Sequence, residues 1–209
     1  VDVYALGAIG FYLLAGREVL TGDSVVEVCS RHLRDEPESP SAVRGGDVDP
    51  GLEALILCCL AKSPGDRPPD GAALAAGVRL GLAEDGAELV KQVHQGFPAG
   101  IVEKLAGELQ LPQQALLRVV RIAPATLGRR RKSLSGRLSA EESDRVYRVA
   151  EAYRNSLQLF EGEVDAARRW LIEPAKALGG VSPFQRLDTE AGAAQVRDLV
   201  GRLEHGVYS

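Results

Sequence analysis

Methionine is absent from this 209-residue chain, and cysteine and aromatic residues are scarce. Two of the three cysteines, Cys58 and Cys59, are adjacent in an apolar stretch, and neighbouring side chains on a helix point about 100° apart. They make a poor pair for a disulfide or a metal ion, and no Cys-x-x-Cys pattern or Cys/His cluster offers another site. We therefore expect reduced thiols, no metal and no other cofactor.

Long hydrophobic runs are also missing. The longest uncharged apolar stretch, residues 3–16, is shorter than the roughly 20 residues that cross a bilayer. It lacks the basic region and cleavage site of a signal peptide. The first residue is valine, which predicts a fragment or a gene truncated at its start. We expect a cytoplasmic protein that does not bind a membrane.

What is present is typical of a globular protein, with 45% hydrophobic and 26% charged residues. The two halves differ in charge, because residues 1–95 have a net charge of −7 and residues 96–209 one of +3. Helical periodicity runs through both halves and predicts an all-α fold. The predicted division is residues 1–82, a linker at 83–95, residues 96–140 and residues 141–209.

The first part contains one uniformly apolar helix, residues 3–16, and amphipathic helices near residues 24–33, 52–62 and 71–82. A helix that is apolar all round is expected to be buried. The strings DVYALG, LLAGR, HLRDEP and LEALILCCLAKSPGDRP resemble the C-terminal part of the large lobe of bacterial serine/threonine kinases of the eukaryotic-like type. Residues 1–82 would then be a truncated segment of that lobe.

This resemblance implies roles for two residues. In the kinases, the residue matched by Asp2 braces the catalytic loop, and the residue matched by Arg67 pairs with a glutamate of the activation segment. Both partners would lie upstream of residue 1. Apolar faces that are left uncovered in such a segment predict self-association or a borrowed partner surface.

Phosphoryl transfer needs parts that this sequence does not contain. A kinase requires a glycine-rich loop over the phosphates, a strand lysine, a catalytic-loop aspartate and a metal-binding aspartate. None of these motifs occurs in the 209 residues. We therefore expect that the chain is not an enzyme.

The middle of the chain predicts a helix-turn-helix. Residues 101–109 and 113–121 each place apolar side chains on one face, and a short turn at 122–124 leads to the basic segment ATLGRRRKSL. Between Arg118 and Arg137 there are seven lysines and arginines and no acidic residue. The alternative interpretation of such a charge run is a solvated face.

The start of a recognition helix faces base edges, and flanking cations neutralise phosphates. The candidate residues for base or groove contacts are Thr126, Arg129 and Arg130. The candidates for phosphate contacts are Arg131, Lys132 and Arg137. Helix-turn-helix repressors commonly act as symmetric dimers, so a homodimer is expected.

The last part predicts three helices. Residues 141–160 follow a capping box formed by Ser139 and Glu142, a second helix covers about 164–172, and Ser182-Pro183 begins another turn of helix. A closing helix should end at Gly206. The strings GRLSAEESDRVYRVAEAY, ARRWLIEPAKALGGVSPFQRLDTE and RLEHGVYS resemble antitoxins of the Xre/MbcA/ParS type, over about residues 96–209.

The antitoxin resemblance implies a helix-turn-helix that represses the protein's own operon and a C-terminal toxin-binding domain. The partner would be a RES-domain toxin that degrades NAD, together with operator DNA. The toxin-facing surface would comprise Trp170, Leu178, Gly179, Gly180, Pro183, Leu187, Thr189, Gly192, Glu204, His205, Gly206, Tyr208 and Ser209.

Structural roles compete with this assignment. Trp170 and Leu187 could belong to the core, Gly179-Gly180 could be a turn, and His205 could cap a helix C-terminus. Two other functions also stay open. The chain could be the C-terminal fragment of a kinase with an appended regulatory or docking domain, or its first part could be an inert remnant of gene fusion.

Overall fold

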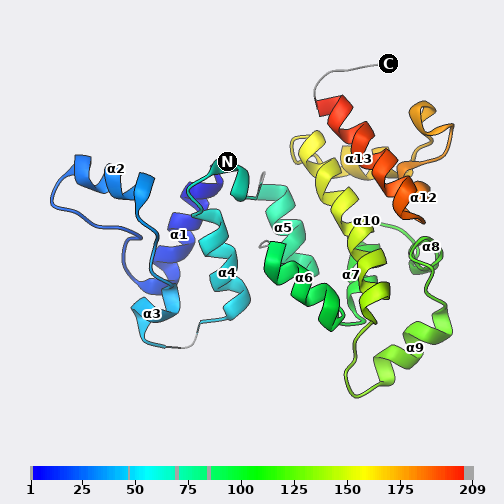
Figure 1. Cartoon of the computed structure of the whole chain (residues 1–209), viewed down its shortest axis with the longest axis horizontal. Helices are drawn as coiled ribbons and strands as arrows, with labels where there is room; N and C mark the ends of the chain where they lie inside the picture. The colour runs from blue at the N-terminus through cyan, green and yellow to red at the C-terminus, as the bar shows by residue number, and fades with distance from the viewer. Residues whose placement is uncertain (1, 47, 69–70, 84–85, 205–209) are drawn as a thin grey trace.

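The computed structural model of the chain describes residues 2–46, 48–68, 71–83 and 86–204. Over these residues the fold is all-α, as predicted, and no strand is formed, although two isolated bridges are present (Figure 1). None of the described helices is long and apolar enough to cross a membrane. The helices are α1 (Val3–Ala15), α2 (Val25–Arg34), α3 (Pro40–Arg44), α4 (Pro50–Cys59), α5 (Gly71–Leu80), α6 (Gly86–Gln95), α7 (Ile101–Glu108), α8 (Gln113–Val119), α9 (Pro124–Lys132), α10 (Ala140–Leu159), α11 (Val164–Ile172), α12 (Pro183–Arg186) and α13 (Glu190–Glu204).

Helices α1 to α4 form one side of the molecule, where α1 packs against α3 and α4 (Figure 1). Close approach of α1 and α4 depends on a small residue, because a Cβ at Gly7 would lie only 2.7 Å from the Cβ of Cys59. The core here is small. Phe11, Ile56 and Leu60 are buried in it, and it is separate from the main core of the chain.

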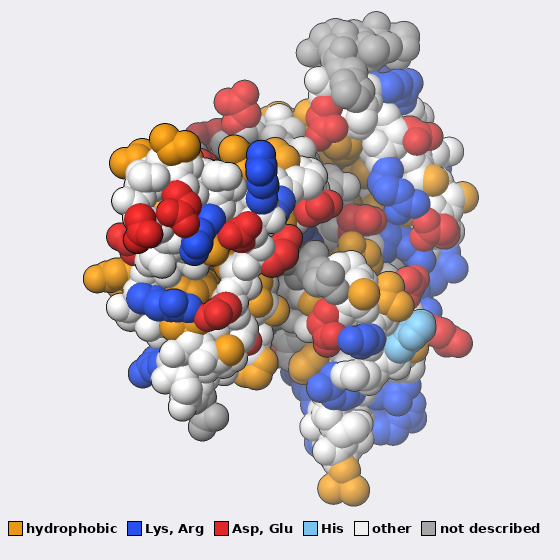
Figure 2. All heavy atoms as spheres, turned by 60° about the vertical axis from the view of Figure 1, so that its left-hand side comes forward, with side chains coloured by type: hydrophobic (Ala, Val, Ile, Leu, Met, Phe, Trp, Pro, Cys, Tyr) orange, Lys and Arg blue, Asp and Glu red, His pale blue; other side chains and the backbone are white. Residues whose placement is uncertain are grey.

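The prediction that the first helix is buried on all sides is wrong. Only Val3, Gly7 and Phe11 of α1 are buried, while Leu13 is 74% exposed and Ile9 is exposed too. The cause is that α3 and α4 cover one face of α1 and leave the opposite face uncovered by any described residue. Figure 2 shows hydrophobic side chains on the surface of this part of the molecule. Self-association through such a face stays a prediction.

The two kinase-matched residues make local contacts. The side chain of Asp2 accepts a hydrogen bond from the backbone N–H of Tyr4 and so caps α1. The guanidinium of Arg67 donates to the carbonyl oxygens of Ala61 and Lys62 and lies 4.8 Å from the centre of the Tyr4 ring. Both side chains therefore stabilise the α1–α4 part itself.

The main core is centred on the 20-residue helix α10, and α5, α6, α11 and α13 all pack against it. Val146, Val149, Tyr153 and Leu157 line the buried side of this helix. Helix α5 contributes Ala76 and Leu80 to the same core, although its sequence belongs to the kinase-like segment. The span 83–95, assigned to a linker from the sequence, contains the helix α6.

Three helix ends use a left-handed residue that is not glycine. Gln110, Arg121 and Glu161 have φ of 53°, 51° and 50° and follow α7, α8 and α10. In each case the next backbone N–H returns to a carbonyl five residues back, as from Leu111 to Ala106 at 2.9 Å. These Schellman-type ends turn the chain sharply between consecutive helices.

Candidate functional site

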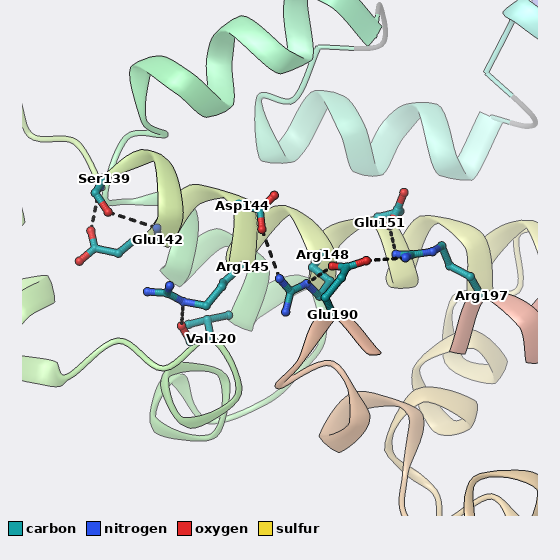
Figure 3. Close-up of polar contacts among 9 residues, drawn as sticks. All are labelled: Val120, Ser139, Glu142, Asp144, Arg145, Arg148, Glu151, Glu190 and Arg197. Atoms are coloured by element: carbon teal, nitrogen blue, oxygen red, sulfur yellow. Dashed lines mark hydrogen bonds and ion pairs between the residues drawn. The ribbon is translucent and has the colours of Figure 1, made fainter. Parts of the chain in front are cut away.

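Helices α7, α8 and α9 form the predicted helix-turn-helix (Figure 1). Leu105, Leu116 and Leu127 are buried, one from each helix, and all three belong to the main core to which α10 also contributes. The turn between α8 and α9 is fixed by α10 as well, because Arg145 donates from Nε to the carbonyl oxygen of Val120 at 2.7 Å (Figure 3). Helix α9 is thereby held on the surface as a rigid element.

Three of the predicted DNA-contacting side chains already have partners inside the chain. Arg130 pairs with Glu142 of α10 at 3.0 Å, and Arg131 pairs with Glu103 of α7 at 3.0 Å. Arg137 donates from Nη1 to the carbonyl oxygen of Gly96 at 2.5 Å. The two carboxylates partly balance the charges of Arg130 and Arg131 before any DNA is bound. The bond from Arg137 holds the segment after α9 in place and leaves the charge of Arg137 unbalanced.

The other predicted cations are free to make contacts. Arg129 and Lys132 are exposed, and no ion pair joins either of them to a described carboxylate. Thr126, near the start of α9, is partly exposed. Arg118 of α8 is exposed as well and was not among the predicted contacts. In Figure 2, lysine and arginine side chains gather toward the end of the molecule where Figure 1 places α9.

Glu142 joins α9 to the N-terminus of α10. Its side chain accepts from the backbone N–H of Ser139 at 2.8 Å, and the hydroxyl of Ser139 accepts from the backbone N–H of Glu142, which confirms the predicted capping box (Figure 3). Burial of this carboxyl opposes its ionisation. The hydrogen bond from Ser139 and the charge of Arg130 outweigh burial and hold the pKa of Glu142 below its usual value.

The stability of the fold should therefore depend on the charge of Glu142. Because the pKa of Glu142 is lower in the folded state, its ionised carboxylate stabilises the fold at pH values above the unfolded-state pKa. This stabilisation is lost as the pH falls through the folded-state pKa. We expect Glu142→Gln to lower the free energy of unfolding by about 1 kcal/mol at pH 7. Urea unfolding between pH 7 and pH 3 should show a smaller loss of stability in this variant than in the parent chain. Equal acid dependence in both proteins would contradict the assignment.

Several of the residues assigned to the toxin-facing surface lie in the core of the last three helices. Leu178 is only 4% exposed, and Pro183, Leu187 and Gly192 are buried too. Trp170 is partly buried, and its ring lies 6.4 Å from that of Phe160 between centres. These residues pack beneath the predicted toxin-facing surface and support the exposed residues that form it.

The remaining described members of that set are on the surface. Gly179 and Gly180 form an exposed turn in which both residues have positive φ, and Thr189 and Glu204 are exposed. His205, Gly206, Tyr208 and Ser209 lie outside the described residues.

A groove of about 850 Å³ lies between the segment at Ala177–Gly179 and helix α13. Arg186, Asp198 and Arg202 line it, so its polar character comes mainly from charged side chains. The groove was not evident from the sequence, because it forms only where the segment at 177–179 meets residues of α13 that lie well beyond it in the chain.

Ion pairs that the sequence analysis missed fix α13 to the rest of the chain. Glu190 at its start pairs with Arg148 of α10 at 3.1 Å and with Arg197 at 2.6 Å (Figure 3). Asp188, just before α13, pairs with Arg121 of the helix-turn-helix at 2.9 Å. These ion pairs therefore connect the helix-turn-helix to the helices that carry the predicted toxin-facing surface.

The sequence of this region matches two known domains. The antitoxin Xre-like helix-turn-helix domain matches residues 88–151, and the antitoxin Xre/MbcA/ParS C-terminal toxin-binding domain matches residues 157–206. The chain is 38% identical to the antitoxin Xre of Yersinia enterocolitica over 131 residues, which are 62% of this chain and 88% of that protein. The chain belongs to the Xre family of antitoxins. The antitoxin Xre of Photorhabdus laumondii is 35% identical over 127 residues, 61% of this chain and 85% of its own length.

This Xre-family antitoxin carries a further segment at its N-terminal side. It is 44% identical to the serine/threonine-protein kinase PknB of Mycolicibacterium smegmatis over 66 residues, which are 32% of this chain and 10% of the kinase. The similarity to kinases is therefore limited to a small part of those proteins. The antitoxin relatives support a non-enzymatic regulatory protein in a toxin–antitoxin system.

Proposed function

We propose that this antitoxin neutralises a RES-domain, NAD-degrading toxin by direct binding and represses its own operon through the helix-turn-helix. The observation that carries the proposal is that a toxin-binding domain shares one core with a surface helix on which Arg129 and Lys132 have no described acidic partner. The protein would act in the cytoplasm as a homodimer, because dimeric repressors match the two-fold symmetry of operators. We also propose the domain division at residues 82, 95 and 140 as a working description of the chain.

The DNA-binding part of the proposal rests on α9. Arg129 and Lys132 are exposed without a described acidic partner, so they can neutralise phosphates without breaking internal ion pairs. Thr126 lies in the first turn of α9 and can approach base edges. Arg130, Arg131 and Arg137 would contribute to the local potential while they hold α9 in place.

Replacement of Lys132 tests the phosphate contact. We expect Lys132→Ala to weaken binding to all DNA sequences about fivefold at 0.15 M salt, because one phosphate contact is lost. The salt slope, which is the slope of log affinity against log salt concentration, should become shallower by about one. Lys176→Ala is the matched control, since it removes the same charge from the exposed turn of the toxin-binding domain. DNA titrations at several salt concentrations measure both quantities. An unchanged slope for Lys132→Ala would contradict the contact.

The toxin-binding part rests on the exposed Gly179-Gly180 turn, Thr189 and Glu204, and on the proposed contacts at His205, Gly206, Tyr208 and Ser209, which lie outside the described residues. Gly179, Gly180, Thr189 and Glu204 lie within the matched toxin-binding domain, and Gly179 also lines the groove beside α13. Partly buried Trp170 and buried Leu187 would support this surface from within rather than contact the toxin through their whole side chains.

Co-expression tests the proposed function directly. A RES-domain toxin encoded beside this gene should deplete cellular NAD and stop growth, and the full antitoxin should restore both. A chain without residues 206–209 should fail to protect, because the proposed toxin contacts His205, Gly206, Tyr208 and Ser209 would be largely removed. The truncated chain should keep the circular dichroism and unfolding midpoint of the parent. Protection by the truncated chain would exclude the tail as a toxin contact.

A second candidate function is suggested by the PknB-like segment. The chain could be the C-terminal fragment of a serine/threonine kinase in which the antitoxin-like part is a regulatory or docking domain. Neighbouring sequence that encodes the glycine-rich loop and the catalytic loop in the same frame would favour it. If residues 1–90 can be removed with protection and DNA binding intact, this segment is instead a remnant of gene fusion.

A further inference from the structure

The segment that follows α9 lies on the surface and is hydrogen-bonded to the rest of the chain at both of its ends. It has the sequence Ser133-Leu134-Ser135-Gly136, and both serines and Leu134 are exposed. Beyond it, the carbonyl oxygen of Gly136 accepts from the backbone N–H of Ala99 at 2.8 Å, and the backbone N–H of Leu138 donates to Phe97 at 2.9 Å. The fold therefore presents the two serines at the end of α9.

The hydroxyls of the two serines have different surroundings. Ser133 donates to the carbonyl oxygen of Arg130 at 2.6 Å and so caps the last turn of α9. The two hydroxyl oxygens are 3.3 Å apart. The hydroxyl proton of Ser133 is directed to the carbonyl oxygen of Arg130. The hydroxyl of Ser135 therefore makes only a long contact, to the hydroxyl oxygen of Ser133. Both serines are exposed, and among the described residues the hydroxyl of Ser135 contacts only that of Ser133, so Ser135 is the acceptor whose hydroxyl is not held by the end of α9.

Four consecutive basic residues precede this segment, Arg129 to Lys132, and a fifth, Arg137, follows it. A kinase whose substrate groove is acidic recognises this charge pattern, and it needs the acceptor in non-helical chain. We propose that Ser135 is a phosphoacceptor for a separate serine/threonine kinase that selects basic residues before its target, and that phosphorylation releases the antitoxin from DNA. The second half of this statement rests on the proposed repressor function.

The reaction uses ATP as the phosphoryl donor. The Oγ of Ser135 forms a bond to the γ-phosphorus, the bond from that phosphorus to the bridging oxygen breaks, and ADP leaves. The hydroxyl proton passes to the catalytic base of the kinase. The 209 residues contain no glycine-rich loop, catalytic loop or metal-binding aspartate motif, so the catalytic groups come from outside these residues.

The expected effect of phosphorylation on DNA affinity follows from the added negative charge. A phosphoserine carries a charge of about −1.5 to −2 at pH 7. Placed after Lys132 and before Arg137, it would offset about two of the cations that face DNA phosphates. The salt slope should then fall by about two, and at 0.15 M salt the affinity should fall on the order of 30-fold.

The experiment uses the full chain, the catalytic domain of a serine/threonine kinase that prefers basic substrates, and Mg-ATP. Mass spectrometry should find one phosphate, on Ser135, in the parent chain and in Ser133→Ala, and none in Ser135→Ala. A kinase that prefers acidic substrates should give no product at this site. Salt titrations with DNA from upstream of the gene then compare the two forms of the parent chain.

Each outcome decides part of the proposal. Phosphate on Ser133 alone, or none on the segment, overturns the assignment of the acceptor. Phosphate on Ser135 with unchanged DNA affinity overturns the regulatory effect. If the unmodified chain does not bind DNA, the repressor function and its regulation both fail, while the mass spectra still decide whether Ser135 is the acceptor.

Discussion

Gly192→Ala should lower the free energy of unfolding by about 3 kcal/mol and abolish toxin binding. A Cβ at Gly192 would lie 1.9 Å from the carbonyl oxygen of Arg186 and 2.9 Å from its carbonyl carbon. Both atoms are backbone, so no side-chain rotation can make room. The turn between α12 and α13 would have to shift, and with it Asp188 and Thr189.

Gly201→Ala is the matched control on the same helix. No heavy atom lies within 4 Å of the position that its Cβ would take. An alanine inside a helix is favoured over glycine by roughly 0.5–1 kcal/mol, so this variant should be slightly more stable than the parent. Urea unfolding gives both values. Equal stability of the two variants would show that the turn before α13 can relax around a methyl group.

Phe97→Ala should be more damaging still, with a loss of about 3–5 kcal/mol. The ring is 2% exposed and belongs to the main core, which joins the helix-turn-helix to the toxin-binding helices. The backbone of the same residue donates to the Oγ of Ser143 at 2.8 Å and accepts from Leu138. The alanine variant can still make both backbone hydrogen bonds, but it lacks the ring that fills this part of the main core.

The loss should affect both functions together. Because one core supports α9 and α13, Phe97→Ala should weaken DNA binding and toxin protection in parallel at 37 °C. Leu134→Ala is the control, since that side chain is fully exposed and its removal should change stability by less than about 0.5 kcal/mol. Loss of only one function in Phe97→Ala would argue against a shared core.

Local features of this fold could be predicted from the sequence because they depend on neighbouring residues. The capping box at Ser139 and Glu142 was predicted, and so was the cap at Ser182 with proline in the first turn. The second helix of the last part was predicted near residues 164–172 and spans Val164–Ile172. Short-range hydrogen bonds and apolar spacing determine these elements, and both can be recognised in the sequence.

Long-range pairing could not be predicted in the same way. A run of arginines predicts a cationic face, but it does not show that Arg130 and Arg131 are paired with Glu142 and Glu103. The uniform apolarity of α1 does not show which face its neighbours cover. The place of α5 in the antitoxin core also depends on contacts with a helix more than 60 residues away.

The position of α5 has a consequence for how such genes recombine. Leu74 of this helix packs with Val3 and Cys59 on the kinase-like side, while Ala76 and Leu80 pack into the antitoxin core. A crossover on either side of α5 would strip an apolar surface from one product. We expect a chain that lacks α5 to expose the apolar face of α10 against which α5 packs.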